Sequence, residues 1–314
     1  MNVRLVRIGR RQLAVDSKAE IFQAHRPRLL GVAYRMLGAK SDAEDVLHDA
    51  WLRWDAADTT DVRSSEAWLT TTVTRLSIDR LRRAKAERDS YFGPWLPEPL
   101  SDADMSSPDV SLERDEDVSI AFLTMLETLS PEERAVFVLH DILDDDYADI
   151  AQTVGKTEVA CRQMVHRARE RLTSRHRRFL VDDATRIRML EKFIEAANRG
   201  DRDELIALFA EDAVMTTDSG GKAVAVHRPL HGAVRIAYLW FAIARRVGRR
   251  AERRIVYVNG QPALASFYKG RLHSVSTIDT DGERIHALYT IANPDKLGSF
   301  TRLVTTSANT ASHG

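Results

Sequence analysis

The chain has 314 residues, with 46 basic side chains (Lys and Arg) and 46 acidic ones, so its formal net charge is zero. This length predicts two or three domains, and a hydrophobic fraction of 44% excludes a chain that is disordered throughout. The single cysteine, Cys161, excludes an internal disulfide framework and favours a reducing compartment, the cytoplasm. No apolar run reaches the roughly 18 residues of a membrane-spanning helix, so no membrane partner is expected.

The zero net charge hides a strong segregation of charge along the chain. Residues 75–88 carry a net charge of +4 and residues 156–178 a net charge of +6. Residues 101–117, between these two runs, carry a net charge of −6. Because nucleic-acid-binding proteins gather Lys and Arg on particular faces, the two basic runs keep DNA open as a partner. For each run taken alone, a solvated helix face is the alternative interpretation.

The first 90 residues predict three helices. Apolar residues recur at helical spacing up to Gly38, which ends the first helix. The second helix is expected to open with a capping box made by Ser41 and Glu44, and its other acidic residues lie outside an apolar stripe. After a polar loop over residues 55–65, a third helix is predicted over residues 66–88, and its second half is the first basic run.

Residues 91–118 lack sustained periodicity and contain several prolines, so they are predicted to form a linker. Its first part, residues 91–97, is too aromatic for an inert spacer and is expected to dock on another part of the protein. Residues 119–180 are helical again, and Ser130 is the predicted cap of a helix that starts at Pro131.

Two short helical patterns on either side of Gly155 predict a helix-turn-helix, because glycine supplies the positive φ that the turn needs. The second helix is expected to start at Thr157 as its N-cap, to run to about Arg175 and to enter the major groove of DNA. Cys161 falls on its apolar face, where a buried structural thiol is expected and no metal site, since one thiol cannot hold a zinc ion.

Residues 181–300 change character and predict an α+β domain. Helices are expected over residues 185–199 and 201–210, and a third over residues 233–246 interrupts a series of strand-like runs. The predicted strands are residues 213–217, 223–227, 254–258, 263–268, 272–278 and 284–291. Helices followed by a meander favour a cone or an open barrel. The small polar tail, residues 301–314, is expected to be mobile.

Two motifs together resemble a known family. Residues 42–54 (DAEDVLHDAWLRW) and 67–83 (AWLTTTVTRLSIDRLRR) resemble region 2 of the sigma-70 family of transcription initiation factors. The helix-turn-helix that ends at residues 165–169 (VHRAR) resembles region 4. Because only a linker separates these regions, the arrangement resembles that of the extracytoplasmic-function (ECF) group.

Three further motifs resemble one subgroup of the ECF family, in which a SnoaL-like domain is fused to the C-terminus. They are residues 95–99 (WLPEP), 218–222 (DSGGK) and 293–297 (NPDKL). Ser219 departs from the subgroup, which commonly has glycine at that position.

The resemblance implies a multidomain fold: two all-α sigma domains (a region 2 helical bundle and a region 4 helix-turn-helix) and a C-terminal α+β, SnoaL-like cone of the NTF2 and ketosteroid-isomerase type. The implied parts are an N-terminal extension (1–18), region 2 (19–90), the linker (91–118), region 4 (119–180), the SnoaL-like domain (181–300) and the tail (301–314).

The same resemblance implies that the chain binds core RNA polymerase and promoter DNA to direct transcription initiation. The acidic second helix would dock on the β′ clamp helices, and region 4 would contact the β flap. The residues expected to bind polymerase are Asp42, Glu44, Asp45 and Asp49. Those expected to recognise and melt the −10 element are Thr60, Arg63, Ser64, Arg75, Arg80, Arg82 and Arg83. Those expected to read the −35 element are Thr157, Glu158, Arg162, Gln163, His166, Arg167 and Arg169.

The SnoaL-like domain is expected to regulate the sigma regions within the same chain, so that a separate anti-sigma factor is not necessarily required. The expected contact joins the linker residues Trp95, Leu96 and Pro97 to Asp218, Gly220, Gly221, Lys222, Asn293, Pro294, Asp295 and Lys296. Two alternatives remain open: a plain helix-turn-helix repressor, and a DNA-binding regulator fused to a ligand-binding or isomerase-like enzyme domain. No catalytic residue, cofactor or metal is expected, because the histidines of this domain are scattered.

Overall fold

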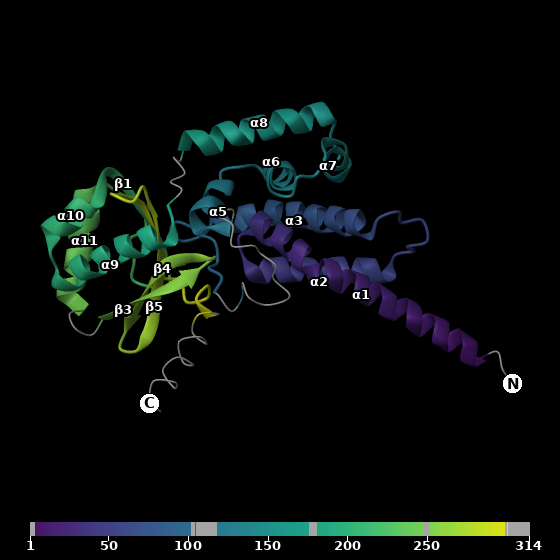
Figure 1. Ribbon diagram of the computed structural model, residues 1–314, viewed down its shortest axis with the longest axis horizontal. Coiled ribbons are helices and arrows are strands. Elements are labelled where there is room, and N and C mark those ends of the chain that lie inside the picture. Colours follow the sequence, from purple (N-terminus) through teal and green to yellow (C-terminus); the bar gives the residue numbers. More distant parts are fainter. Residues whose placement is uncertain are drawn as a thin grey trace. The chain divides into compact units, whose positions relative to one another are not determined.

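The computed structural model describes residues 4–101, 104, 118–175, 181–247, 251–298 and 300 (Figure 1). The chain divides into two compact units. Unit 1 consists of residues 1–86, 106–113 and 126–172, and unit 2 of residues 87–105, 114–125 and 173–314. The predicted tail and most of the acidic stretch over residues 101–117 lie outside the described residues.

The N-terminal part of unit 1 is built from α1 (Arg4–Leu37), α2 (Lys40–Ala56) and α3 (Ser65–Asp89) (Figure 1). Gly38, with φ +69°, ends α1 as predicted. Helix α1 begins well before the predicted apolar pattern and takes up most of the expected N-terminal extension. Each of the three helices buries large side chains, with Tyr34, Trp54 and Leu69 all at most 2% exposed.

The two predicted capping boxes have different outcomes. At α6 the box is present, since the Ser130 hydroxyl accepts from the Glu133 amide at 3.2 Å and the Glu133 carboxylate accepts from the Ser130 amide at 3.1 Å. At α2 the prediction is wrong, because the helix begins at Lys40, its N-cap is Ala39, and no side chain caps it. Ser41 therefore lies inside the first turn, two positions after the N-cap, and does not cap the helix.

The helix-turn-helix is present where the sequence predicts it. The helices that follow the linker are α5 (Ile120–Leu126), α6 (Pro131–Phe137), the π-helix η2 (Val138–Ile142), α7 (Tyr147–Val154) and α8 (Glu158–Arg175). Gly155 ends α7 with φ +67°, a value that favours glycine. Cys161 is fully buried in the shared core with Ile150 and Val165, and burial raises the pKa of its thiol. This confirms its predicted structural position.

The C-terminal domain is α+β, as predicted, with a mixed sheet. Its elements are α9 (Asp183–Arg199), α10 (Arg202–Leu208), β1 (Phe209–Asp218), β2 (Leu230–His231), α11 (Ala233–Val247), β3 (Ala251–Val258), β4 (Gln261–Tyr268), β5 (Arg271–Thr280) and β6 (Ile285–Ile291). The strand order is β2-β1-β6-β5-β4-β3. Strands β3 to β6 form an antiparallel meander, and β1 joins it parallel to β6.

One predicted strand, residues 223–227, is wrong. The segment alternates Ala and Val, but it pairs with no strand, and Val224 is 85% exposed. Strand β1 pairs instead with the two-residue β2, through Val214 and Met215. The ring of His227 packs against Phe92 of the linker, with 4.6 Å between ring centroids. Alternation alone does not make a strand when no neighbouring strand offers its backbone groups.

The two faces of the sheet are covered by different parts of the chain. Helices α9 and α11 pack on one face, where the ring of Phe193 meets those of Trp240 and Phe209 edge to face at 4.8 and 5.8 Å. On the other face, Leu96 of the linker and Ile120 of α5 join a second core with Val275 and Ile291. The linker is therefore part of the hydrophobic core of unit 2. Within the described residues, no helix is long and apolar enough to span a membrane.

The presence of a capping box at α6 and its absence at α2 give a stability prediction. Ser130→Ala should lower the free energy of opening α6 by about 1 kcal/mol, because the bond to the Glu133 amide is lost. Ser41→Ala is the matched control and should change the opening of α2 by less than about 0.5 kcal/mol. Native-state amide hydrogen exchange on the full chain measures both values. Equal losses in the two variants would contradict these assignments.

Candidate functional site

Helix α2 presents an acidic face to solvent. Glu44, Asp45 and Asp49 are exposed, whereas the apolar side chains of the same helix are buried. Asp42 differs, since its carboxylate lies 2.8 Å from the Arg80 guanidinium in a half-buried ion pair. These two residues were predicted to bind different partners, and here they bind each other. Three of the four predicted polymerase-binding residues thus face solvent.

The loop before α3 and the outer face of α3 carry the residues predicted for the −10 element. The Ser64 hydroxyl accepts from the Ala67 amide at 3.2 Å and so caps α3, while Thr60 is bonded to Asp58 and Arg63 is exposed. Arg82 pairs with Asp79 at 3.1 Å. The Nε of Arg83 donates to the Asp79 carbonyl at 3.3 Å. Asp58 and Asp79 are exposed, whereas Arg82 also pairs with the partly buried Glu132 of α6.

Arg75 also binds outside its own helix, because its guanidinium contacts the end of α7 within unit 1. Its Nε donates to the Thr153 carbonyl and a terminal nitrogen donates to the Gln152 carbonyl, both at 2.9 Å. The hydroxyl of Thr71 lies 3.0 Å from that of Thr153. The carboxyl end of a helix attracts a cation. This contact therefore occupies two of the three guanidinium nitrogens of Arg75, whose side chain remains exposed.

Helix α8 exposes a polar stripe. Arg162, Gln163 and His166 all face solvent, and the Thr157 hydroxyl caps the helix by accepting from the Ala160 amide at 3.2 Å, as predicted. Arg162 pairs with Glu158 at 3.0 Å, and its guanidinium lies 4.9 Å from the centroid of the Tyr147 ring. The stripe is thus partly ordered before any ligand binds.

Two other predicted −35 residues are held by acids of the same unit. Arg169 forms a two-pronged ion pair with Asp141 at 2.7 and 2.8 Å, and this bond raises the pKa of Arg169. The Nε of Arg167 lies 3.6 Å from Glu133. Their guanidinium groups are therefore directed towards α6 and η2.

The linker binds the C-terminal domain through the carboxylate of Asp218, at the end of β1. This residue is fully buried. One oxygen accepts from the Tyr91 hydroxyl at 2.6 Å and the Gly220 amide at 3.1 Å. The other accepts from the Leu96 amide at 2.9 Å and the Lys296 ammonium at 2.7 Å. A buried carboxylate is stable only with such a full set of donors. We call these groups the Asp218 cluster.

Lys296 closes the Asp218 cluster from the other side of the linker. Its ammonium also donates to the Leu96 carbonyl and lies 4.0 Å from the centroid of the Trp95 ring. Arg88 also contacts the Trp95 ring, with its guanidinium carbon 3.8 Å from the ring centroid. Burial lowers the pKa of Lys296, although the charge of Asp218 opposes this shift. Leu96 is fully buried, and Pro97 is buried.

The remaining predicted contact residues surround this cluster. The Asn293 side-chain amide donates to the Tyr91 hydroxyl at 2.8 Å, and its carbonyl oxygen accepts from the Asp295 amide at 3.1 Å. Gly220 has φ +56°, and a Cβ there would lie 2.8 Å from the Asn293 side chain and 3.0 Å from the Tyr91 hydroxyl, so glycine is required. The Phe92 ring packs on Gly221. Lys222 and Asp295 form an exposed ion pair, and Pro294 is exposed.

Two residues of this contact were missed as site residues in the sequence. Tyr91 belonged to the aromatic segment but not to the predicted contact set. Asn259 was assigned only to a turn, yet it is 1% exposed and binds the linker three times. Its side chain accepts from the Leu100 amide at 2.8 Å and donates to the Val118 carbonyl at 2.6 Å, and its own amide donates to the Leu100 carbonyl at 2.9 Å. The Asn259-Gly260 pair was the available signal, and it indicates only a turn, which Asn259 makes with a φ of +52°.

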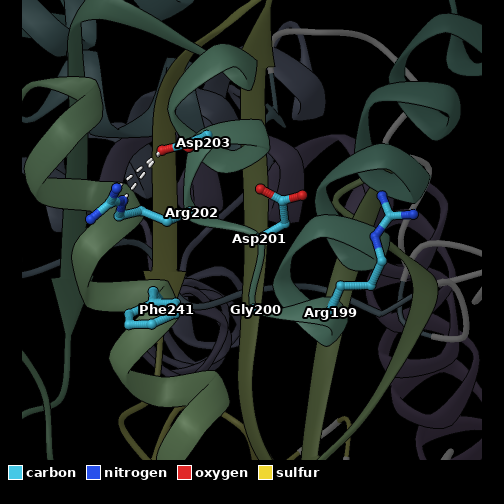
Figure 2. Close-up of a pocket in the computed structure, with 6 residues that line it drawn as sticks. All are labelled: Arg199, Gly200, Asp201, Arg202, Asp203 and Phe241. Carbon is cyan, nitrogen blue, oxygen red and sulfur yellow. Dashed lines mark hydrogen bonds and ion pairs between the residues drawn. The ribbon is translucent and has the colours of Figure 1, made fainter.

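A hollow of about 410 Å³ lies beside α10 and α11 (Figure 2). Arg202 in its wall pairs with Asp203, and Arg199 pairs with Glu204. The Asp201 carboxylate accepts from the Glu204 amide at 3.0 Å and so caps α10. The charged side chains of this hollow therefore bind one another or cap a helix. Within the described ranges, no group of three or more His, Cys, Asp or Glu side chains could hold a metal ion.

Removal of the charge on Asp218 tests the linker contact. Asp218→Asn should weaken protection of the Leu96 and Leu100 amides from hydrogen exchange by about 3 kcal/mol, because Lys296 is left buried without its counter-ion. Asp295→Asn removes an exposed partner of Lys222 and should cost less than about 0.5 kcal/mol. A similar effect of both variants would show that the buried carboxylate is not what holds the linker.

The pH dependence of the same contact follows from Tyr91. Burial, and then the bond to Asp218, raises the pKa of the Tyr91 hydroxyl above its ordinary 10. A raised folded-state pKa gives stability that is complete below about pH 10 and is lost as the pH rises further. The stability difference between the wild-type chain and Tyr91→Phe in denaturant should therefore narrow above pH 10. Tyr238→Phe, at a half-exposed tyrosine, is the control and should show no narrowing.

Comparison with known proteins agrees with this geometry. The family description "Sigma-70 region 2" matches residues 21–87, and "Sigma-70, region 4" matches residues 119–172. The ECF RNA polymerase sigma factor SigJ of Mycobacterium tuberculosis is 34% identical over 287 residues, which cover 88% of this chain and 91% of SigJ. The probable ECF RNA polymerase sigma factor SigI of the same species is 31% identical, over 90% of this chain and 95% of SigI.

One solved structure is similar over most of the chain. The crystal structure of the Mycobacterium tuberculosis extracytoplasmic function sigma factor SigJ aligns with a TM-score of 0.73 at 32% identity, and covers 90% of this chain and 98% of that one. The predicted fold class, helical sigma regions with a C-terminal α+β domain, is confirmed. The chain belongs to the ECF group of the sigma-70 family of RNA polymerase sigma factors.

Proposed function

We propose that this chain is a promoter-specificity subunit that binds core RNA polymerase through α2 and directs transcription initiation through α3 and α8. One observation carries the proposal: the exposed acidic face of α2 and the exposed polar stripe of α8 lie on separate helices of unit 1. A DNA-binding repressor has no need of a separate acidic surface. The curated relatives that match most of the chain are sigma factors by name, which favours this function over an enzymatic one.

The acidic face of α2 is the surface proposed for the β′ clamp helices. Asp45 and Asp49 are one helical turn apart and exposed, beside an apolar stripe that already belongs to the core. Charges at the rim of an interface speed up association and set its register more than they add affinity. Asp42 takes part only if its ion pair with Arg80 opens.

The loop before α3 is the surface proposed for the −10 element. Opening a promoter takes bases out of the stack, which costs a few kcal/mol. Thr60, Arg63 and Ser64 offer hydroxyl and guanidinium groups to such a base from an exposed loop. The arginines of α3 would hold the neighbouring phosphates, and each phosphate neutralised steepens the fall of affinity with salt.

Helix α8 is proposed to read the −35 element with its exposed stripe. The first turns of a recognition helix face the base edges in the major groove. Arg162, Gln163 and His166 lie on that stripe, while the pairs that Arg167 and Arg169 form with acids assign them to phosphate contacts at most.

In the proposed complex, Arg75 turns from α7 to the DNA backbone. It would exchange the Gln152 and Thr153 carbonyls for a phosphate, which weakens the contact between α3 and α7. We propose that the protein without DNA keeps this contact and that the promoter competes for Arg75. The exchange replaces neutral acceptors with a charged one, and charge-assisted hydrogen bonds are the stronger kind.

The C-terminal domain is proposed to regulate this exchange through the linker. The linker joins region 2 to region 4, and the Asp218 cluster holds its residues on the sheet. A held linker limits the distance that the two regions can span on a promoter. Release of the Asp218 cluster would lengthen the free tether, so the domain would act within the chain in the way a separate regulator acts from outside.

Run-off transcription with mycobacterial core RNA polymerase and the full chain tests the proposed function. Promoters are first selected from a randomised library with that holoenzyme, and they should yield transcripts only when the chain is present. Asp45→Asn with Asp49→Asn should raise the concentration needed for half-maximal transcription about tenfold. Glu191→Gln with Glu195→Gln, on the exposed side of α9, is the matched control and should have no effect. Absence of any chain-dependent transcript would overturn the proposal.

A further inference from the structure

The exposed stripe of α8 contains one apolar side chain. Val159, Arg162, Gln163 and His166 follow one another at intervals of three, one and three residues, so they lie on one face of the helix. The opposite face is buried and includes Cys161. Val159 is 61% exposed. Val159 is thus an uncharged, branched side chain at the N-terminal end of a stripe whose other three side chains are polar.

The fold gives no structural reason for valine at this place. Val159 is absent from the group of buried and partly buried residues that form the helix-turn-helix core. Valine is also a poorer helix former than alanine, because its branched Cβ loses freedom against the preceding turn. Single exposed apolar side chains are common on protein surfaces. Val159 is distinguished by its place, because the first turns of a recognition helix face the base edges in the major groove.

The side chains that flank Val159 in the sequence form hydrogen bonds or ion pairs within the protein. The Thr157 hydroxyl accepts from the Ala160 amide at 3.2 Å as the helix cap. The Glu158 carboxylate holds Arg162 at 3.0 Å, and Arg162 also lies over the Tyr147 ring. Val159 is therefore the first side chain of α8 that makes neither a capping bond nor an ion pair within the helix. In a recognition helix, this position faces the base edges.

We propose that Val159 recognises the 5-methyl group of a thymine in the −35 element, an inference that rests on the proposed function of α8 as the recognition helix. The thymine methyl is the one apolar group that base edges present in the major groove. Guanine, adenine and cytosine would each place a hydrogen-bonding group against the valine, with no partner for it. Val159 thus specifies one base pair, and Gln163 and His166, one and two turns further along, face others.

A methyl-deletion experiment tests this inference. Holoenzyme containing the full chain selects duplexes randomised across the −35 element, and the wild-type chain should require thymine at one position. Replacement of that thymine by deoxyuridine removes only the methyl group and should weaken wild-type binding about fourfold, the effect of burying one such group. Val159→Ala should relax the preference at that position alone and should be insensitive to deoxyuridine there, so the two changes are not additive.

The controls separate this inference from the function on which it rests. Val224→Ala, at another exposed valine, should leave the selected sequence and the deoxyuridine effect unchanged. Arg162→Ala and Gln163→Ala should alter the selected sequence, and if they do not, the recognition role of α8 itself is wrong. If they do, while Val159→Ala and deoxyuridine have no effect or act equally at every position, only the thymine assignment is overturned. Circular dichroism of Val159→Ala checks that α8 remains folded.

Discussion

The buried carboxylate of Asp218 is the interaction on which the organisation of unit 2 depends. It is fully buried, and its two oxygens accept four hydrogen bonds, two of them from the linker. A buried charge without a complete set of donors is strongly destabilising, so the linker is stable only where the Tyr91 hydroxyl and the Leu96 amide both reach it. This requirement also places Leu96 in the core on one face of the sheet. A polar interaction therefore sets the position, and apolar burial adds to the stability.

Unit 1 follows a different rule, because the side chains proposed for promoter binding are themselves at least partly exposed. Arg75 is bound to helix-end carbonyls, Arg80 to Asp42 and Arg169 to Asp141. An ion pair that stays partly solvated contributes little to stability, so in the proposed function DNA would displace such a partner at small cost. The Asp218 cluster is buried instead, and its release would cost more.

Much of the candidate site could be predicted from short patterns. The Ser130 box and the Gly155 turn depend on a few neighbouring residues, and both are present. The Ser41 box failed because α2 starts at Lys40, two residues earlier than that box requires, with Ala39 as its N-cap. The strand predicted over residues 223–227 failed because pairing needs a partner strand, and the segment has none. Asn259 was missed because its partners are more than 140 residues away in the chain.

The sequence by itself determined the identity of the helical modules, the apolar faces and the motifs around Asp218, since these depend on spacing within one element. Only the tertiary structure decided which charges are available. Asp42 and Arg80, or Arg169 and Asp141, are distant in sequence, and nothing in either residue's own pattern shows that they pair. The physical reason is that the groups around a charged side chain decide whether it is available to a ligand, and folding brings those groups from other elements. Val159 illustrates the same point, because its exposure on α8 is what supports its proposed role in recognition.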